Sequence, residues 1–168
     1  MNTASPVASG PRPPRLDFLC ESHVKLGEFT MMGSYADGHE RGMLQLLGGT
    51  FEGPAMRGTI LPSTKDWPVY YGDGVRRTDV DYVYLTDDGA HLFVTVRGYR
   101  YEPAEMSGSA LSAEQVVPAP NLLRVFVEIQ APADSRYAWL SRNLFFGVGG
   151  SGGLSGDRTA VLRLYRLL

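Results

Sequence analysis

Cysteine, clustered basic residues and long apolar runs are scarce in this chain of 168 residues, and each scarcity excludes a class of protein. Cys20 is the single cysteine, so the chain can form neither an internal disulfide framework nor a metal site built from several cysteines. No segment approaches the ~18 consecutive apolar residues that a membrane helix requires. No run of lysine and arginine alternates with aromatic residues, and the formal net charge is −2. We therefore expect no nucleic-acid partner and no membrane partner.

Metal and cofactor signatures are also missing. The three histidines, His23, His39 and His91, do not have the spacing of a zinc-binding motif, so we expect no metal. The glycine-rich stretch 147–153 lacks the following lysine of a phosphate-binding loop and the strand–helix unit of a dinucleotide site. We therefore expect no cofactor. A single cysteine fits a reducing compartment, and we expect the protein to be cytoplasmic.

The composition indicates one ordinary globular domain with many turns. Hydrophobic residues make up 43% of the chain and charged residues 20%, and there are 20 glycines and 11 prolines, which favours many short elements. Residues 1–15 are small, polar and rich in proline, and they lack the apolar core of a signal peptide. We expect a flexible N-terminal tail at 1–15 and a single domain at 16–168.

The dominant pattern is alternation of apolar and polar residues, which predicts strands with one buried face. It is clearest at 123–130 and is repeated at 16–26, where Cys20 falls on the buried face, and at 160–165. Other runs are rich in the aromatic and β-branched residues that strands favour: 43–52, 55–61, 80–86, 91–101 and 143–148.

Turns and loops separate these runs. The sequence Asp87-Asp88-Gly89 predicts a tight hairpin, and turn formation is the expected role of Asp88. We expect a long loop at 102–120 that covers a site, and a loose hairpin loop at 149–157. One short helix is expected near 134–142, capped by Asp134 or Ser135.

This succession predicts an all-β fold: a single-domain, closed antiparallel β-barrel of about 8–10 strands with one short helix near 134–142. Closure would remove exposed sheet edges. A barrel of about eight strands is just wide enough to hold one small ligand.

A series of short motifs resembles a known family. In chain order they are Gly48-Gly49-Thr50-Phe51-Glu52-Gly53-Pro54 with Gly58 and Pro62, Asp66-Trp67, Tyr82, Thr86-Asp87-Asp88-Gly89-Ala90, Tyr137-Ala138-Trp139-Leu140 with Arg142, and Leu144-Phe145-Phe146-Gly147. Across roughly 16–168 the chain resembles domain-of-unknown-function family 3237 (DUF3237), also called uncharacterised protein family UPF0311. The resemblance implies a lipocalin-like β-barrel and almost nothing about activity.

Two neighbouring residues form the first candidate site. Asp66 could act as a general base in a pocket, or as an acid whose pKa is raised by apolar neighbours. The alternative is that Asp66 only shapes a turn or caps backbone N–H groups. Trp67 could form the wall for a flat ligand or could belong to the core.

Three further residues complete the candidate catalytic set. If Glu52 points inward it needs a partner, and Arg142 is the natural cation. That pair could merely close the barrel, or Arg142 could bind a substrate carboxylate or enolate. Tyr82 could donate a proton or a hydrogen bond, or could be a core tyrosine with a satisfied hydroxyl.

Aromatic residues supply the remaining candidates for substrate binding. Trp139 lies beside Arg142 in the sequence, and Tyr99 and Tyr101 could rim the mouth of the barrel. The alternative for the two tyrosines is an exposed surface or a dimer interface, and we expect a monomer or homodimer.

Two functions remain open. The first is a cofactor-independent enzyme of the isomerase, cyclase, lyase or hydratase type, acting on a small, partly apolar or aromatic molecule inside the barrel. The second is a non-catalytic carrier or sensor of an apolar ligand. A structural protein whose barrel is filled by its own side chains is a third interpretation. An enzyme requires converging ionisable groups, whereas a carrier requires an apolar lining.

Overall fold

Strands account for most of the part of the chain that the structure describes. The computed structural model describes residues 13–62, 64–72, 74–101, 123–152 and 158–168. In order, the elements are β1 (Leu16–Ser34), β2 (Glu40–Glu52), β3 (Arg57–Ile60), β4 (Thr64–Asp66), β5 (Val69–Tyr70), β6 (Val75–Thr86), β7 (His91–Tyr101), β8 (Leu123–Gln130), the 3-10 helix η3 (Ala138–Arg142), β9 (Phe145–Gly152) and β10 (Thr159–Leu167).

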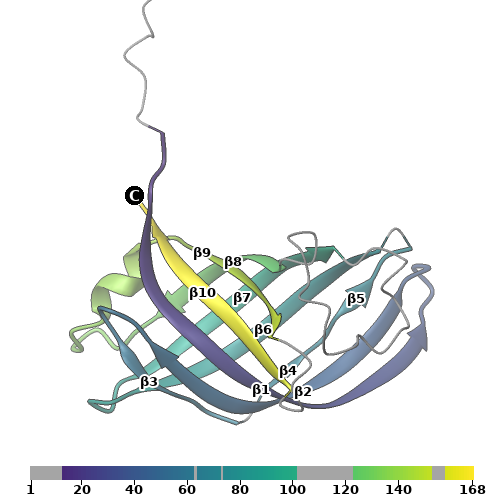
Figure 1. Ribbon diagram of the computed structural model, residues 1–168, viewed down its shortest axis with the longest axis horizontal. Helices are drawn as coiled ribbons and strands as arrows, with labels where there is room; N and C mark the ends of the chain where they lie inside the picture. Colours follow the sequence, from purple (N-terminus) through teal and green to yellow (C-terminus); the bar gives the residue numbers. More distant parts are fainter. Residues whose placement is uncertain (1–12, 63, 73, 102–122, 153–157) are drawn as a thin grey trace, which may run out of the picture.

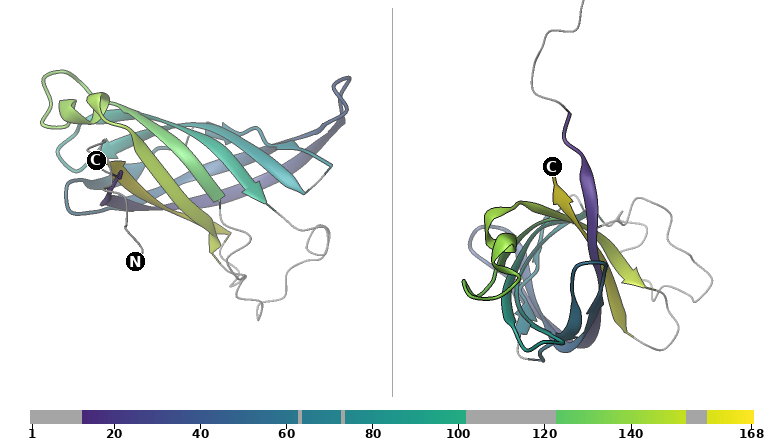
Figure 2. Two further views of the ribbon diagram at one scale, coloured as in Figure 1. Left: turned by 90° about the horizontal axis from the view of Figure 1, so that it is seen from above. Right: turned by 90° about the vertical axis from the view of Figure 1, so that its left-hand side faces the viewer.

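The strands form one antiparallel sheet that closes into a ring, as the view along its long axis shows (Figure 2). The order is β1-β10-β9-β8-β7-β6-β3-β2, and β1 also pairs with β2, so the sheet returns to its start. The short strands β4 and β5 both pair with β2, and β5 also pairs with β6. The all-β barrel architecture predicted from the alternating pattern is confirmed.

The predicted strands agree with the structure to different degrees. Strands β7 and β8 occupy the ranges expected from residue composition and from alternation, respectively, whereas β1 continues to Ser34 and β4 and β5 were not expected. The loose loop predicted at 149–157 is wrong for its first residues, because β9 continues to Gly152 and pairs with β10. A Cβ atom on Gly149 would lie 2.4 Å from the carbonyl oxygen of Val161, so glycine permits this close pairing. Residues 1–12 and the predicted loop 102–120 lie outside the described residues.

One end of the barrel is filled by apolar side chains and covered by η3, which lies at the left in Figure 1. The fully buried side chains of this core include Phe51, Tyr84, Leu92, Ile129, Leu140, Phe145 and Leu164. The predicted short helix is present only as a 3-10 helix at 138–142. Its N-cap is Tyr137, with no side-chain cap hydrogen bond, so the capping predicted for Asp134 or Ser135 is wrong.

The hairpin between β6 and β7 anchors this covering segment. Gly89 has φ +87°, and the expected turn at 87–89 is confirmed. Asp88 accepts hydrogen bonds from the hydroxyls of Thr86 (2.6 Å) and Tyr137 (3.1 Å), and its carboxylate lies 2.9 Å from the guanidinium of Arg136. Asp88 therefore joins the turn to the segment that covers the barrel end.

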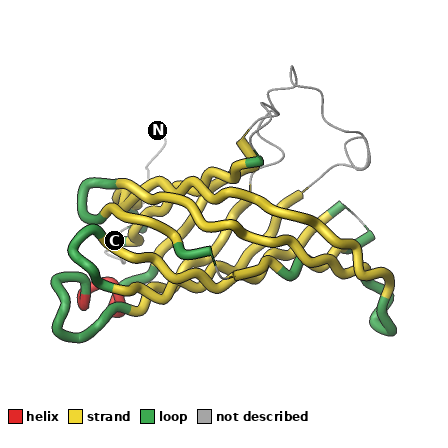
Figure 3. Tube along the Cα trace, turned by 90° about the horizontal axis from the view of Figure 1, so that it is seen from below, coloured by secondary structure: helices red, strands yellow, loops and turns green. Residues whose placement is uncertain are grey.

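At the other end, the hairpin of β1 and β2 extends beyond the ring (Figures 1 and 3). Several of its large apolar side chains are exposed: Phe29, Met31 and Met32. None of the described segments forms a helix of the length and apolarity needed to cross a membrane.

Candidate functional site

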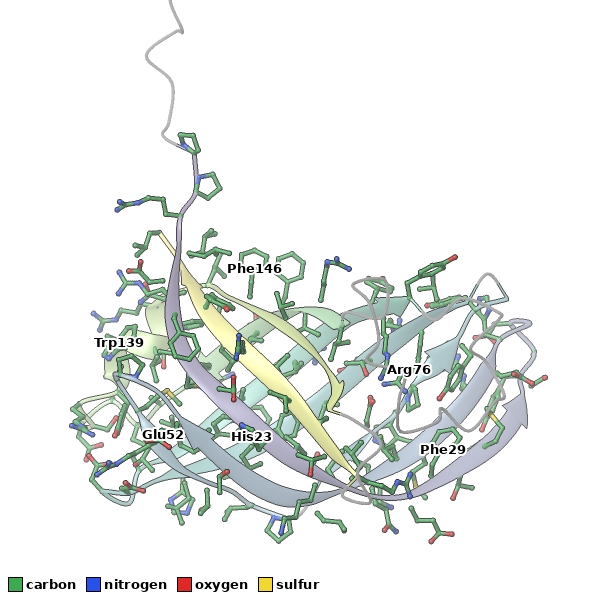
Figure 4. All side chains as sticks on the ribbon, viewed as in Figure 1. His23, Phe29, Glu52, Arg76, Trp139 and Phe146 are labelled. Carbon is green, nitrogen blue, oxygen red and sulfur yellow. The ribbon has the colours of Figure 1, made fainter. Side chains whose placement is uncertain are left out.

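A polar cluster lies inside the barrel at the end opposite η3. Alternation along β6 directs Thr78, Val80, Tyr82 and Tyr84 inward, where all four are buried. Extending the same alternation toward the start of β6 places Arg76 on this inner face. Figure 4 shows Arg76 in the half of the molecule away from η3.

Asp66 is the acid of this cluster. It ends β4, opposite Leu44 of β2, and only 4% of its surface is exposed. Its Oδ2 accepts a hydrogen bond of 2.8 Å from the hydroxyl of Thr78, and its Oδ1 accepts one of 3.3 Å from the backbone N–H of Asp79. Two groups of β6 therefore fix the position of the carboxylate, and the same carboxylate lies near a buried cation.

That cation is Arg76. One of its terminal nitrogens, Nη2, lies 3.8 Å from Oδ2 of Asp66, and only 14% of the Arg76 side chain is exposed. The Nε atom of Arg76 is buried and has no hydrogen-bond partner among the described residues. Within the described part of the chain, the Nε atoms of Arg77 and Arg166 are buried without a partner in the same way, and what distinguishes Arg76 is its position beside the buried carboxylate of Asp66, where an oxygen-bearing ligand could accept a hydrogen bond from it.

Burial dominates the electrostatics of the acid. Desolvation raises the pKa of Asp66, and the opposing effects of Arg76, the Thr78 hydroxyl and the Asp79 N–H only reduce that rise. Desolvation also raises the pKa of Tyr82, with a further contribution from the negative charge of Asp66. Tyr82 therefore stays protonated and can act as a hydrogen-bond donor but not as a base.

The cluster combines three chemical capacities. An acid whose pKa is raised by burial can serve as the proton donor or acceptor of acid–base catalysis. An arginine can stabilise negative charge that develops on a substrate oxygen. The neighbouring inner face is apolar, with Val80, Val94 and Val96 buried, so a partly apolar molecule would be compatible with it.

The expected inward pair of Glu52 and Arg142 is wrong. Both residues are exposed, and Phe51 takes the inward position next to Glu52, stacking on Tyr84 at 4.6 Å between ring centroids. Successive strand residues face opposite sides, so Glu52 cannot share the inner face with Phe51. Figure 4 shows Glu52 near the filled end of the barrel, away from Arg76.

Trp67 lies outside the barrel rather than in its wall or core. It is 49% exposed and lines a recess of about 480 Å³ on the outer face, together with Lys65, Arg77, Asp79 and Asp81. The ammonium of Lys65 lies 5.7 Å from the centre of the Trp67 ring. Asp66 and Trp67 are neighbours in sequence but point to opposite sides of the sheet, so the structure separates them.

The other predicted aromatic residues also lie apart from the acid. Tyr99 and Tyr101 are exposed at 57% and 48% and face outward on β7. Trp139 is partly buried against the filled end, with its ring 6.4 Å from that of Phe145. The guanidinium of Arg166 lies over the Trp139 ring, at 5.5 Å from the ring centre.

The predicted site residues Asp66 and Tyr82 both lie inside the barrel. Two further residues of the cluster, Arg76 and Thr78, were not predicted from the sequence. The strand alternation that places Tyr82 on the inner face also places residues 80, 78 and 76 there, so this pattern could have identified both residues. Within the described ranges, no group of three or more histidine, cysteine, aspartate or glutamate side chains could hold a metal ion. Cys20 is fully buried, and desolvation raises its pKa to about 12.

Comparison with known proteins places this geometry in context. A family profile described as "Protein of unknown function (DUF3237)" matches residues 14–167. A UPF0311 protein of Rhodopseudomonas palustris is 27% identical over 124 residues, covering 74% of this chain and 80% of that protein.

Two further relatives bear on fold and on activity. A beta-barrel like protein from Acinetobacter baumannii has a solved structure that aligns with a TM-score of 0.76 and 26% identity, covering 95% of this chain and 99% of the other. The hydroalkoxylation enzyme phnH of Penicillium herquei is 32% identical over 89 residues, which is 53% of this chain and 58% of the enzyme.

Proposed function

The chain belongs to the DUF3237 family, and we propose that it is a cofactor-independent enzyme that moves a proton on a small, partly apolar organic substrate inside the barrel. The observation that carries the proposal is the buried Asp66 carboxyl beside Arg76, whose Nε donor has no partner among the described residues. A desolvated acid beside a cation that still has an unused hydrogen-bond donor is typical of a functional site rather than of a purely structural one.

Asp66 is the group that exchanges the proton. Its carboxyl is anchored by Thr78 and by the N–H of Asp79, which fixes its direction, and its pKa is raised by burial. A raised pKa brings the acid closer to the operating pH, where both its charged and its neutral form are accessible during turnover.

Arg76 is the group that binds the substrate oxygen. Its guanidinium would donate hydrogen bonds to a carbonyl, phenolate or carboxylate oxygen and stabilise the charge that develops there. In this proposal Arg76 takes the anion-binding role that the sequence suggested for Arg142. Tyr82, buried and protonated, lies on the same inner face and would help to position the substrate.

The reaction class that fits best is addition of a hydroxyl group across a carbon–carbon double bond that is conjugated to a carbonyl group, or the reverse elimination. In the forward direction the Asp66 carboxylate accepts the hydroxyl proton as the C–O bond forms and the double bond opens. Arg76 stabilises the resulting enolate oxygen, and Asp66 returns its proton to carbon, so atoms and charge balance. The partial similarity to a hydroalkoxylation enzyme supports this class over isomerisation alone.

The experiment is a ligand screen followed by product analysis. Hydroxylated aromatic compounds with a conjugated side chain, and their cyclic ethers, would be screened by thermal shift and each mixture analysed by mass spectrometry and NMR. A ligand at about 100 times its Kd raises the free energy of unfolding by ~2.7 kcal/mol, which a thermal shift detects. The proposal predicts at least one compound that both stabilises the protein and is converted.

Matched variants assign the roles. Asp66→Asn should lower kcat by roughly 100-fold or more while the ligand still binds, because the amide cannot exchange the proton. Arg76→Met should weaken binding as well as turnover. Asp81→Asn is the control, since Asp81 lies on the outer face of β6 and accepts a hydrogen bond from Thr95. Turnover that survives Asp66→Asn would exclude the acid–base role, and binding without conversion would identify a carrier.

A further inference from the structure

Four aromatic side chains, arranged as two ring pairs on neighbouring strands, form a ladder across the outer face of the barrel. The cross-strand pairs are Phe18 with Tyr165, Tyr165 with Phe146, and Phe146 with Phe126, so the row spans β1, β10, β9 and β8. The ring centroids of Phe18 and Tyr165 lie 5.8 Å apart, and those of Phe126 and Phe146 lie 4.8 Å apart. Phe18 is 44% exposed and Phe126 is 63% exposed. Figure 4 shows Phe146 at this edge of the molecule.

A second apolar row lies beside the ladder on the same strands. Leu16 pairs with Leu167, and the Leu167 N–H donates to the carbonyl of Leu144 at 2.9 Å. Leu16 and Leu144 are 53% and 59% exposed. The two rows together expose on the order of 500 Å² of apolar surface, counting each side chain at about 150–250 Å². An apolar patch of this size equals the largest patch on a typical monomer, and such patches are often interaction sites.

The amount of apolar surface is what a homodimer of ordinary size needs at its centre. A standard interface buries about 800 Å² on each partner, with an apolar core and a polar rim. The rim is present here: Glu21 is paired with Arg163 at 2.6 Å on one side, and Arg97, opposite Phe126, is paired with Asp79 at 3.0 Å on another. We define the aromatic ladder and the leucine row together as the aromatic face.

The arrangement is complementary to itself. A two-fold axis parallel to the strands and between β9 and β10 would place Tyr165 of one copy against Phe146 of the other at the centre of the contact, with Phe18 and Phe126 of the two copies on its sides. In the next row it would place Arg163 against Val148, with Glu21 and Arg124 of the two copies on its sides, because these four residues occupy the β1, β10, β9 and β8 positions of that row. Aromatic groups thus meet aromatic groups at the centre, and an acid and a base of the two copies lie on the same side, as an isologous contact requires.

We propose that the aromatic face is a homodimer interface, in which the sheets of two copies of this chain pack face to face across a two-fold axis parallel to the strands. Because the sheet closes into a ring, its outer face is curved, so β9 and β10 of the two copies approach each other most closely and Tyr165 and Phe146 form the centre of the contact. The interface is separate from the polar interior, so it does not depend on the proposed reaction.

The test is the oligomeric state of the full chain by sedimentation equilibrium over a wide concentration range. The wild type should be a dimer, and Phe126→Glu should weaken dimerisation by roughly tenfold or more, because a charge would be buried in the apolar contact. Leu144→Lys provides a second variant at an exposed position. Phe93→Glu is the matched control: Phe93 is also an outward phenylalanine, 44% exposed, but it pairs with Gln130 outside the aromatic face.

Charge reversal tests the direction of the axis. Glu21→Lys and Arg124→Glu should each weaken the dimer, and the double variant should recover at least part of the loss. A monomeric wild type would overturn the proposal and mean that another occupant, such as residues 1–12, covers the face. A dimer that Phe126→Glu leaves intact, or that Phe93→Glu disrupts equally, would overturn it as well. Failure of the double variant to recover would overturn the proposed axis.

Discussion

The carboxylate of Asp66 lies 3.8 Å from the guanidinium of Arg76, inside the barrel, and neither side chain is more than slightly exposed. Asp66 is held by Thr78 and by the backbone of Asp79, so the pair is positioned by β6 rather than by either residue alone. This relationship gives the protein both a candidate proton carrier and a candidate anion-binding group.

Burial of Asp66 should be visible in the pH dependence of stability. Its ordinary pKa is 3.8 and its folded pKa is raised, so between these values the folded state binds more protons than the unfolded state. The contribution of Asp66 to the free energy of unfolding therefore decreases as pH rises through this window. Asp66→Asn removes this pH-dependent contribution, so the free energy of unfolding of the variant relative to that of the wild type should increase from about pH 4 upward.

Urea unfolding at a series of pH values measures this difference. Asp81→Asn, on the exposed outer face of β6, serves as the control for loss of a negative charge. A constant offset between Asp66→Asn and wild type at every pH would show that the pKa of Asp66 is not raised by folding.

The buried hydrogen bond between Ser22 and Tyr84 should contribute measurably to stability. The two hydroxyl oxygens are 2.8 Å apart, and both residues are fully buried in the filled end. Tyr84→Phe leaves the Ser22 hydroxyl without this partner and should cost about 1–2 kcal/mol. A double-mutant cycle with Ser22→Ala should give a coupling energy of ~1 kcal/mol, whereas Tyr165→Phe on the outer face should change little. Additive effects would mean that the hydrogen bond contributes nothing.

A side chain at Gly48 should destabilise the fold for two reasons, the left-handed backbone and a steric clash, whose costs can be measured separately. It has φ +83°, and a Cβ atom would lie 2.6 Å from the carbonyl oxygen of Ile60. Gly38 has a similar φ of +79° but nothing within 4 Å of its Cβ position. Gly38→Ala should therefore cost ~1 kcal/mol from the left-handed backbone alone, and Gly48→Ala about 3 kcal/mol or more. Equal losses in chemical denaturation would show that the backbone of β3 yields without cost.

The fold was largely predictable because its main signal is local. Alternation at 123–130 reports directly which side chains face the interior, the run of β-favouring residues at 91–101 marks a strand, and the structure has β8 and β7 at those bounds. The strands β4 and β5 have three and two residues, too few to show a period, and they exist because β2 and β6 offer them partners.

The candidate site was only partly predictable. Asp66 and Tyr82 were identified, but Arg76 was missed because the strand was expected to begin at 80 rather than at Val75. Glu52 was assigned inward although Phe51 competes for the same face, and a large apolar side chain gains more from burial than a carboxylate does. Trp67 was grouped with Asp66 because they are neighbours, whereas strand neighbours point to opposite faces.

The sequence by itself determined the all-β architecture, the hairpin at 87–89 and the burial of Cys20, because each depends on a short-range pattern or on the conformational freedom of one glycine. Only the tertiary structure decided that Asp66 lies beside Arg76 and that Phe18, Tyr165, Phe146 and Phe126 form one row. Closing the sheet sets the register between strands that are far apart in the chain, and register is a property of pairs of strands that no single segment encodes.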